Sequence, residues 1–387
     1  MKKIIKLLVL LILATGCRKP YNPPAVTSTA GYLVVEGVIN SGTDSTVIKL
    51  SHTVNIANKV TANPVSDAVI AVVSDQGASY PLTGTGNGNY VSTGLNLDNS
   101  HQYRLTIKTP DNKQYQSDLA PVLVTPPIDS IGFNIITVPV PGIQIYANTH
   151  DASNTTKYFR WDYDEAWAFQ SKYVSYWISN GTSLLIRSPD QSISLCYTND
   201  VSSDVVIASS AKLQQDLLYQ SPIAFISSAS EKISSEYSIL LRQYALTADA
   251  YNFWVNLKKN TEQLGSIFDA QPSQLEGNIH CVTNPAEPVI GYVSVCKVSS
   301  KRVFIPRSAL PAFTPTYPYS CEQDTDVTYT SQWYNDLVNN PKSPLIPTGP
   351  PPPPVGYPSK FFYSTRDCVD CTIRGTKTAP PFWQVIH

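Results

Sequence analysis

The chain carries little charge for its size. Asp, Glu, Lys and Arg make up only 15% of its 387 residues, against about 25% in an average soluble protein, and the formal net charge is −1. No stretch is strongly basic, so the sequence lacks the positive surface that nucleic-acid binding requires. The polar surface must therefore consist mainly of uncharged Ser, Thr, Asn, Gln and Tyr side chains.

The sequence also lacks the spaced motifs of common catalytic and metal sites. Its five histidines never occur at the spacing of a zinc-binding helix, and it has no Walker loop and no nucleophile elbow. A glycine cluster at 84–88 is followed by no helical pattern and is better explained as a hairpin turn. We therefore expect no catalytic residues, no cofactor and no metal, in a protein that is not an enzyme.

The apolar run near the N-terminus, residues 7–13, is far shorter than the roughly 20 residues that cross a bilayer. It follows three lysines and precedes Ala14-Thr15-Gly16, which is the layout of a cleaved export signal. A signal that ends in small residues and then Cys17 resembles the lipobox of bacterial lipoproteins, in which the cysteine is acylated. An ordinary signal with a chance cysteine is the alternative. We expect a signal peptide at 1–16, lipidation of Cys17 and a Pro-rich tether at 17–30.

Short strand-like runs dominate the next hundred residues. About seven runs rich in β-branched and aromatic residues are separated by turn sequences such as NSG at 40–42 and DQG at 75–77. This spacing predicts an immunoglobulin-like or prealbumin-like β-sandwich over 31–125. Two adjacent prolines at 126–127 mark its end. The predicted fold class is therefore mainly β.

A larger β-rich domain is expected over 126–310, with two short-to-medium helices inserted among its strands. One helix is predicted near 210–219. The other, near 247–264, is better specified because Thr247 can cap its start and Gly265 can end it. Residues 311–387 are predicted to be a Cys- and Pro-rich extension packed on the larger domain.

Six cysteines follow Cys17 in the sequence. An even number in an exported chain indicates disulfide bonds, and six cysteines allow 15 pairings. The C-x-x-C pair at 368–371 could also serve redox chemistry or zinc, but it stands in a Gly- and Pro-flanked tail, so structural disulfides are favoured. The candidate disulfide cysteines are Cys196, Cys281, Cys296, Cys321, Cys368 and Cys371.

Residues 160–167 (RWDYDEAW) combine the densest acidic group with aromatic residues. Asp162, Asp164 and Glu165 could serve a glycosidase, which needs two carboxyl groups roughly 5–10 Å apart, but a polar strand face is the simpler interpretation. The rings could stack on a sugar or contact a partner, although such rows are more often core. The candidate ligand or partner surface consists of Trp161, Tyr163, Trp167, Trp177 and Trp254.

Seven short phrases occur in order across most of the mature chain: VVEG at 34–37, PIDS at 127–130, YFRWDY at 158–163, YSILLRQY at 237–244, FDAQPS at 268–273, GNIHC at 277–281 and PVIGY at 288–292. Together they resemble a family of Bacteroidota outer-membrane lipoproteins that is known only as a domain of unknown function (number 4249). The resemblance implies a lipoprotein often encoded beside TonB-dependent receptors, and it implies no catalytic residue.

These features together predict an outer-membrane lipoprotein that acts as a non-catalytic binding or accessory component of a TonB-dependent uptake system. The expected partners are the lipid bilayer, through acylated Cys17, a TonB-dependent receptor, and a small ligand or glycan. Arg18 and Lys19 follow Cys17, where surface lipoproteins of this group often have acidic residues, so either membrane face is compatible with the sequence. The alternatives are a glycoside-hydrolase-like surface enzyme and a structural or adhesive surface lipoprotein.

Overall fold

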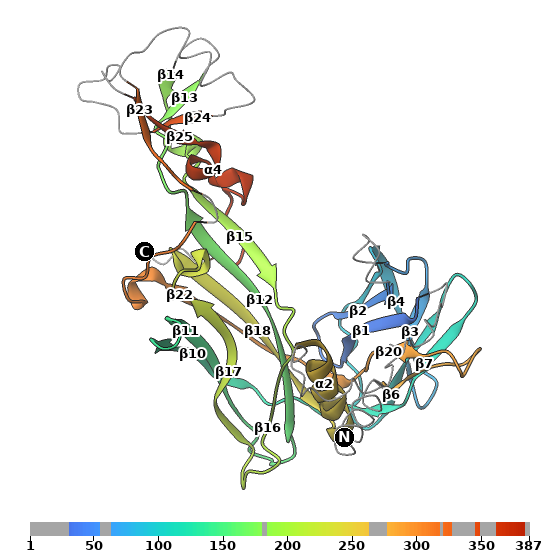
Figure 1. Cartoon of the computed structure of the whole chain (residues 1–387). Helices are drawn as coiled ribbons and strands as arrows, with labels where there is room; N and C mark the ends of the chain where they lie inside the picture. Colours follow the sequence, from blue (N-terminus) through green and yellow to red (C-terminus); the bar gives the residue numbers. More distant parts are fainter. Residues whose placement is uncertain are drawn as a thin grey trace, which may run out of the picture.

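The computed structural model of the protein describes residues 31–54, 63–179, 184–262, 277–317, 320–326, 345–348 and 361–383. Figure 1 shows two β domains that meet near helix α2 (Ala248–Glu262), and a small lobe at the far end of the larger domain. The predicted signal peptide, Cys17 and the tether lie outside the described residues. The mainly β fold class is confirmed.

The first domain wraps twelve short strands around a single core. In β2 (TVIKLSH), buried and exposed positions alternate, which places Ile48 and Leu50 fully inside. Pairing joins the strands in the order β19-β7-β6-β3-β4-β5-β2-β1-β21-β9, with β8 beside β6 and β20 beside β1. The strands before residue 126 are β1 (Leu33–Asn40), β2 (Thr46–His52), β3 (Val69–Ser74), β4 (Ser79–Gly86), β5 (Asn89–Ser92), β6 (Gln102–Lys108), β7 (Gln114–Ser117), β8 (Ala120–Pro121) and β9 (Leu123–Val124).

Residues 277–298 return to the first domain, although the sequence analysis assigned them to the larger one. In this segment β19 (Ile279–Cys281) pairs with β7, β20 (Val289–Ile290) pairs with β1, and β21 (Val295–Lys297) lies between β1 and β9. The side-chain amide of Asn278 exchanges two hydrogen bonds with the backbone of Val293 and so fixes the segment's fold. The expectation of a larger domain that is continuous over 126–310 is thus wrong, because the chain leaves that domain at 277–298 and returns to it at 299–306.

Glu287 joins this returning segment to the β6–β7 hairpin. Its carboxylate accepts hydrogen bonds from Tyr115 Oη at 2.8 Å and lies 2.8 Å from Lys113 Nζ. Burial alone would raise the pKa of Glu287, but these donors outweigh burial and hold its pKa below the ordinary value. A carboxyl group of this kind stabilises the fold above its unfolded pKa, and the contribution is lost as the pH falls through its folded pKa.

We expect Glu287→Gln to lower the free energy of unfolding by about 1 kcal/mol near neutral pH and by much less near pH 3. Glutamine keeps an acceptor for Tyr115 but removes the charge that Lys113 faces. Urea unfolding at several pH values measures the difference. Glu36→Gln is the matched control, because its ion pair with Lys49 is 3.6 Å long and exposed and should cost almost nothing. A loss at Glu287 that stays constant down to pH 3 would contradict the prediction.

The larger domain packs two sheets face to face around a second core. One sheet has the order β10-β11-β17, and the other has the order β15-β12-β18-β22 with β16 also paired to β12. Their strands are β10 (Ile128–Ile136), β11 (Gly142–His150), β12 (Tyr158–Gln170), β15 (Leu195–Val201), β16 (Val206–Ser209), β17 (Leu217–Ser227), β18 (Glu236–Leu246) and β22 (Ser299–Pro306). Short 3₁₀ turns lie at η1 (Pro189–Gln191), η2 (Glu231–Ile233) and η3 (Arg307–Ala309).

A buried polar network ties the two sheets together. The indole N–H of Trp161 donates to Gln243 Oε1 at 2.8 Å. Gln243 Nε2 in turn donates to the carbonyl of Pro126 and to Thr149 Oγ1, both at 2.9 Å. Because all of these groups have partners, the network adds a specific contact between the sheets without leaving an unsatisfied polar group.

One predicted helix is confirmed and the other is wrong. Helix α2 covers Ala248–Glu262, and Thr247 Oγ1 accepts the N–H of Ala250 at its start. The segment predicted as a helix near 210–219 instead forms a turn and the beginning of β17. The turn is closed by Asp216, which accepts a hydrogen bond from Ser210 Oγ at 2.8 Å and pairs with Lys157 at 2.6 Å. Pairing of β17 with β11 then overrides the local helical pattern.

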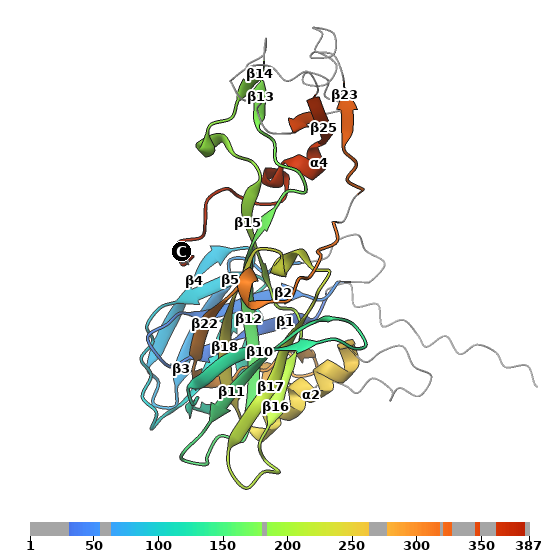
Figure 2. The ribbon, with the colours of Figure 1, turned by 90° about the vertical axis from the view of Figure 1, so that its left-hand side faces the viewer.

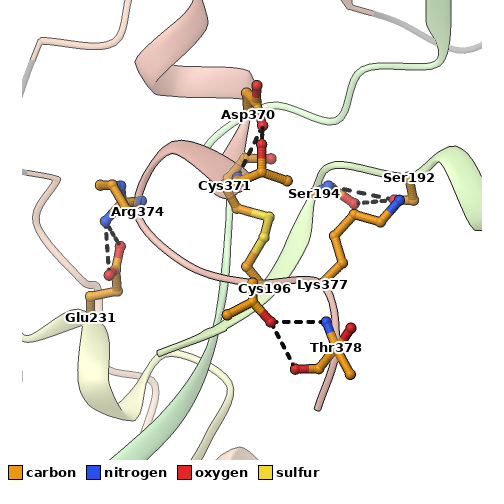
Figure 3. The surroundings of a disulfide bond; sticks show 12 residues. Ser192, Ser194, Cys196, Glu231, Asp370, Cys371, Arg374, Lys377 and Thr378 are labelled. Atoms are coloured by element: carbon orange, nitrogen blue, oxygen red, sulfur yellow. Dashed lines mark hydrogen bonds and ion pairs between the residues drawn. A yellow bond between two sulfur atoms is a disulfide. The ribbon is translucent and has the colours of Figure 1, made fainter. Parts of the chain in front are cut away.

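Two disulfides fasten the lobe and the tail. Cys196 is bonded to Cys371, and Cys321 is bonded to Cys368, so the two cysteines of the C-x-x-C pair have different partners. Figure 3 shows the first of these bonds with the nearby ion pair between Arg374 and Glu231. The lobe itself consists of β13 (Trp177–Ser179), β14 (Leu184–Ile186), β23 (Asp324–Asp326), β24 (Leu345–Thr348), β25 (Phe361–Thr365), α4 (Arg366–Val369) and η4 (Cys371–Ile373).

The tail that follows Cys371 returns to the larger domain, where Trp383 packs against Tyr197 and Phe304. The remaining cysteines, Cys281 and Cys296, are buried free thiols, so the expectation of six paired cysteines does not hold for them. Both lie on strands of the returning segment, and burial raises the pKa of Cys296 to about 11. Such a thiol stays protonated and acts as a small core residue.

Candidate functional site

The aromatic residues predicted as a ligand or partner surface belong mostly to the interior. Trp161, Tyr163 and Trp177 are 1%, 6% and 3% exposed, so the prediction is wrong for these three. On β12, the first two face the opposite sheet and help to fill the space between the layers. Trp167 and Trp254 are half-buried, and each carries a cationic side chain over its ring.

The two acids on the even-numbered face of β12 share one arginine from β18. Arg242 Nε lies 2.6 Å from Asp162 Oδ1, and its two terminal nitrogens lie 2.7 Å from the oxygens of Asp164. The hydrogen bond to Asp164 raises the pKa of Arg242 above its ordinary value, against the effect of burial. The bidentate geometry fixes the guanidinium plane and both carboxylates.

Glu165 lies on the other face of β12, away from that pair. It accepts a hydrogen bond from Tyr237 Oη at 2.9 Å and forms an ion pair with Lys232. A glycosidase needs one carboxylic acid that keeps a proton to donate. Each of the three acids is instead engaged by a cation of the protein itself, because Arg242 binds Asp162 and Asp164 and Lys232 binds Glu165.

Asp162 and Arg242 contribute to one wall of a cleft of about 610 Å³ between the two domains. Its other wall comes from β1 and the β1–β2 turn of the first domain. The cleft is lined by Gly37, Val38, Asn40, Asp44, Ser45, Val47, Arg160, Asp162, Leu240, Arg242, Tyr244, Val298 and Ser300. Because the two walls belong to separate domains, a ligand or partner bound here would contact both at once.

Arg160 is held in the cleft by two aromatic rings and one carboxylate. Its guanidinium carbon lies 4.6 Å from the ring centre of Tyr244 and 4.4 Å from that of Trp254. One terminal nitrogen donates to Asp162 at 3.1 Å. Within the described ranges, its Nε is buried and has no hydrogen-bond partner. A planar donor that is fixed in this way is suited to an acceptor oxygen supplied by a bound group.

The polar residues of the cleft carry both signs of charge. Burial and the nearby Asp162 carboxylate raise the pKa of Tyr244, so this phenol remains a neutral donor. On the first domain, Asn40 Oδ1 accepts the backbone N–H of Gly42 at 3.0 Å and that of Val298 at 3.2 Å. Val298 directly precedes β22, so the latter bond holds the first-domain wall beside the start of a strand of the larger domain.

We expect Arg242→Met to lower the free energy of unfolding by about 1–3 kcal/mol, because it leaves Asp164 without a cation and Asp162 with Arg160 alone. Equilibrium urea unfolding measures this loss. The double change with Asp164→Asn is the matched control and should recover most of the stability, since Asp162 keeps its ion pair with Arg160. Equal stabilities for the single and double variants would contradict this interpretation.

Sequence reasoning identified the acids but missed the arginines and the cleft. Arg160, Asp162 and Asp164 alternate along one strand and so share a face, which indicates a charged face that needs counter-charges. Their main partner, Arg242, is 78 residues beyond Asp164 in the chain. The first-domain wall is more distant still, and no local pattern links it to β12.

Among the described residues, no group of three or more His, Cys, Asp or Glu side chains could hold a metal ion. The same part of the chain contains no helix long and apolar enough to cross a membrane. Fold and cleft together define a two-domain, mainly β protein with a disulfide-fastened lobe and a polar groove between its domains.

The sequence model of one protein family, described as a domain of unknown function (DUF4249), matches residues 18–302. This match spans most of the sequence, and the chain belongs to that family. It covers both β domains up to β22, whereas the three cysteines of the lobe and tail lie beyond it. No curated protein matches the sequence.

Proposed function

We propose that the protein is an outer-membrane lipoprotein that serves as a non-catalytic binding or accessory component of a TonB-dependent uptake system. The lipobox-like sequence around Cys17 supports the anchor. The family resemblance supports the link to a receptor. In this proposal the inter-domain cleft is the surface that contacts the receptor or the material that the receptor takes up.

One observation carries the binding role of the cleft: the guanidinium of Arg160 lines it and is held in place by the rings of Tyr244 and Trp254. A guanidinium that is fixed in this way can donate to a carboxylate, carbonyl or hydroxyl oxygen of a bound group with little further loss of side-chain entropy. The acids that could have supported hydrolysis are engaged by Arg242 instead. The cleft therefore has the features of a recognition site.

Co-purification tests this proposal. The tagged full-length protein is extracted from membranes in a mild detergent, and its partners are identified by mass spectrometry. We expect a β-barrel receptor to be recovered with the wild type. Recovery of the protein without any β-barrel partner would count against the proposal.

A cleft-blocking variant makes the same experiment specific. Ser300 is exposed and lines the cleft, so Ser300→Trp should fill it and reduce receptor recovery at least severalfold. Gln114→Trp is the matched control, because Gln114 is exposed on β7 and does not line the cleft. Equal receptor recovery with both variants would assign the contact to another surface.

A further inference from the structure

The outer face of the β10-β11-β17 sheet combines aromatic rings with side-chain amides. We define this face, called the sheet platform below, by its outward residues Asn134, Gln144, Tyr146, Asn148, Tyr219 and Phe225. Figure 2 shows the three strands in front of the rest of the larger domain. Tyr219 and Phe225 are 73% and 46% exposed, which is unusual for rings on a β-sheet surface.

Two of the rings lie against glycines of the neighbouring strand. A Cβ atom on Gly132 would stand 2.5 Å from Tyr146 Oη and 2.7 Å from its Cζ. A Cβ atom on Gly142 would stand 2.8 Å from Phe225 Cζ. Glycine at these two positions therefore lets each ring lie along the sheet rather than stand away from it. Tyr146 and Phe225 occupy diagonal positions on paired strands, about 7–8 Å apart.

The amides on the platform are held in place by one another. Gln220 Oε1 accepts from Asn134 Nδ2 at 3.2 Å, and Gln220 Nε2 donates to Tyr219 Oη at 3.2 Å. Asn148 Oδ1 accepts the backbone N–H of Gln220 at 2.7 Å, and its Nδ2 donates to Ser130 Oγ at 2.8 Å. Each primary amide offers two N–H groups and two lone pairs, so this network keeps hydrogen-bonding capacity for a ligand.

The platform carries almost no charge. Apart from their tyrosines, the three strands contain only two residues with ionisable side chains, and these are Asp129 and His150. These two lie at one end of the sheet, where His150 Nδ1 is 2.7 Å from Asp129 Oδ2. A surface of this composition has nothing to attract a polyanion or a polycation. It matches a ligand that is uncharged, carries many hydroxyl groups and has apolar C–H faces.

We propose that the sheet platform binds an uncharged polysaccharide chain, whose sugar rings stack on Tyr146, Tyr219 and Phe225 while the amides bond its hydroxyl groups. The platform lies on the three-stranded sheet, whereas the cleft lies between the domains, so this site is separate from the one assigned above. Its failure would leave the receptor test unaffected, because that test depends on Ser300 and the cleft.

Affinity electrophoresis of the full mature chain tests the proposal, with hydroxyethyl cellulose, xyloglucan and galactomannan as neutral probes and alginate as the charged probe. We expect at least one neutral polymer, and not alginate, to retard the protein. The double variant Tyr219→Ala and Phe225→Ala should weaken that binding about tenfold or more. Tyr176→Ala removes a ring that is 38% exposed outside this sheet and is the matched control, which should bind like the wild type.

The single variant Tyr219→Ala guards against misfolding, because it removes the most exposed ring and disturbs the core least. It should also weaken binding while keeping the wild-type unfolding midpoint. The proposal is overturned if no neutral polymer retards the wild type, if alginate binds equally well, or if both platform variants bind normally. It is also overturned if sedimentation shows a dimer that the double variant abolishes, since a second copy would then cover the platform.

Discussion

Replacing Cys17 with alanine is expected to move the mature protein from the envelope fraction to the soluble fraction almost completely. In the proposed anchor, each buried methylene of an acyl chain contributes about 0.8 kcal/mol of membrane affinity, so the loss of a whole diacylglycerol removes the anchor. Cell fractionation followed by immunoblotting measures the redistribution.

Cys281→Ala is the matched control for this change. It removes a cysteine that is buried in the first domain and unpaired, so it should leave the protein in the envelope fraction. If Cys17→Ala still sediments with the envelope at normal yield and normal processing, the anchor is wrong. The tether and the membrane-facing role would then have to be abandoned with it.

Removing the disulfide between Cys196 and Cys371 is expected to cause the largest loss of stability, about 3–5 kcal/mol. This bond joins residues 175 positions apart, so it restricts the unfolded chain strongly. It also holds the tail in place for the bridge between Tyr197 and Thr376 and for the packing of Trp383. Urea unfolding of the double alanine variant under oxidising conditions measures the loss.

The other disulfide supplies an internal comparison. Cys321 and Cys368 are only 47 positions apart, and the loop-closure model therefore gives this bond about 1 kcal/mol less stabilisation. The variant without it should lie between the wild type and the variant without Cys196–Cys371. The reverse order would show that loop length does not govern the contribution of these bonds.

Local patterns account for the parts of the fold that the sequence predicted well. The strands of the first domain follow from alternation, as in β2, where every second residue from Thr46 to Leu50 is buried. Helix α2 follows from the cap at Thr247. These features depend on neighbours in the chain, so they can be recognised without knowledge of the rest of the fold.

Distant pairings account for what the sequence did not reveal. Strand β21 pairs with β1 and β9, which lie about 170 to 260 residues earlier in the chain. Near residue 213, a helical pattern yields to turn contacts with Asp216 and to pairing with β11. The alternation in β12 correctly separates its two faces, but it does not tell which face is buried. For that reason Trp161 and Tyr163 looked like surface candidates although they fill the core.

The cleft could be predicted only in part for the same reason. The acids at 162 and 164 drew attention as a group, but their meaning depends on Arg242, which reaches them from the neighbouring strand. Without that arginine they resemble a catalytic pair. With it they form a fixed, charge-balanced wall beside Arg160. The interpretation of these two acids therefore depends on one side chain.

Site-specific photocrosslinking in intact cells tests the central claim of a membrane-anchored partner that engages a receptor through its inter-domain cleft. A photoreactive amino acid placed at Ser300 lies in the cleft, and one placed at Gln114 lies outside it. The account predicts a covalent adduct with a TonB-dependent β-barrel receptor from Ser300 and little or none from Gln114. Adducts with such a receptor from Gln114 alone, or from neither position, would contradict it.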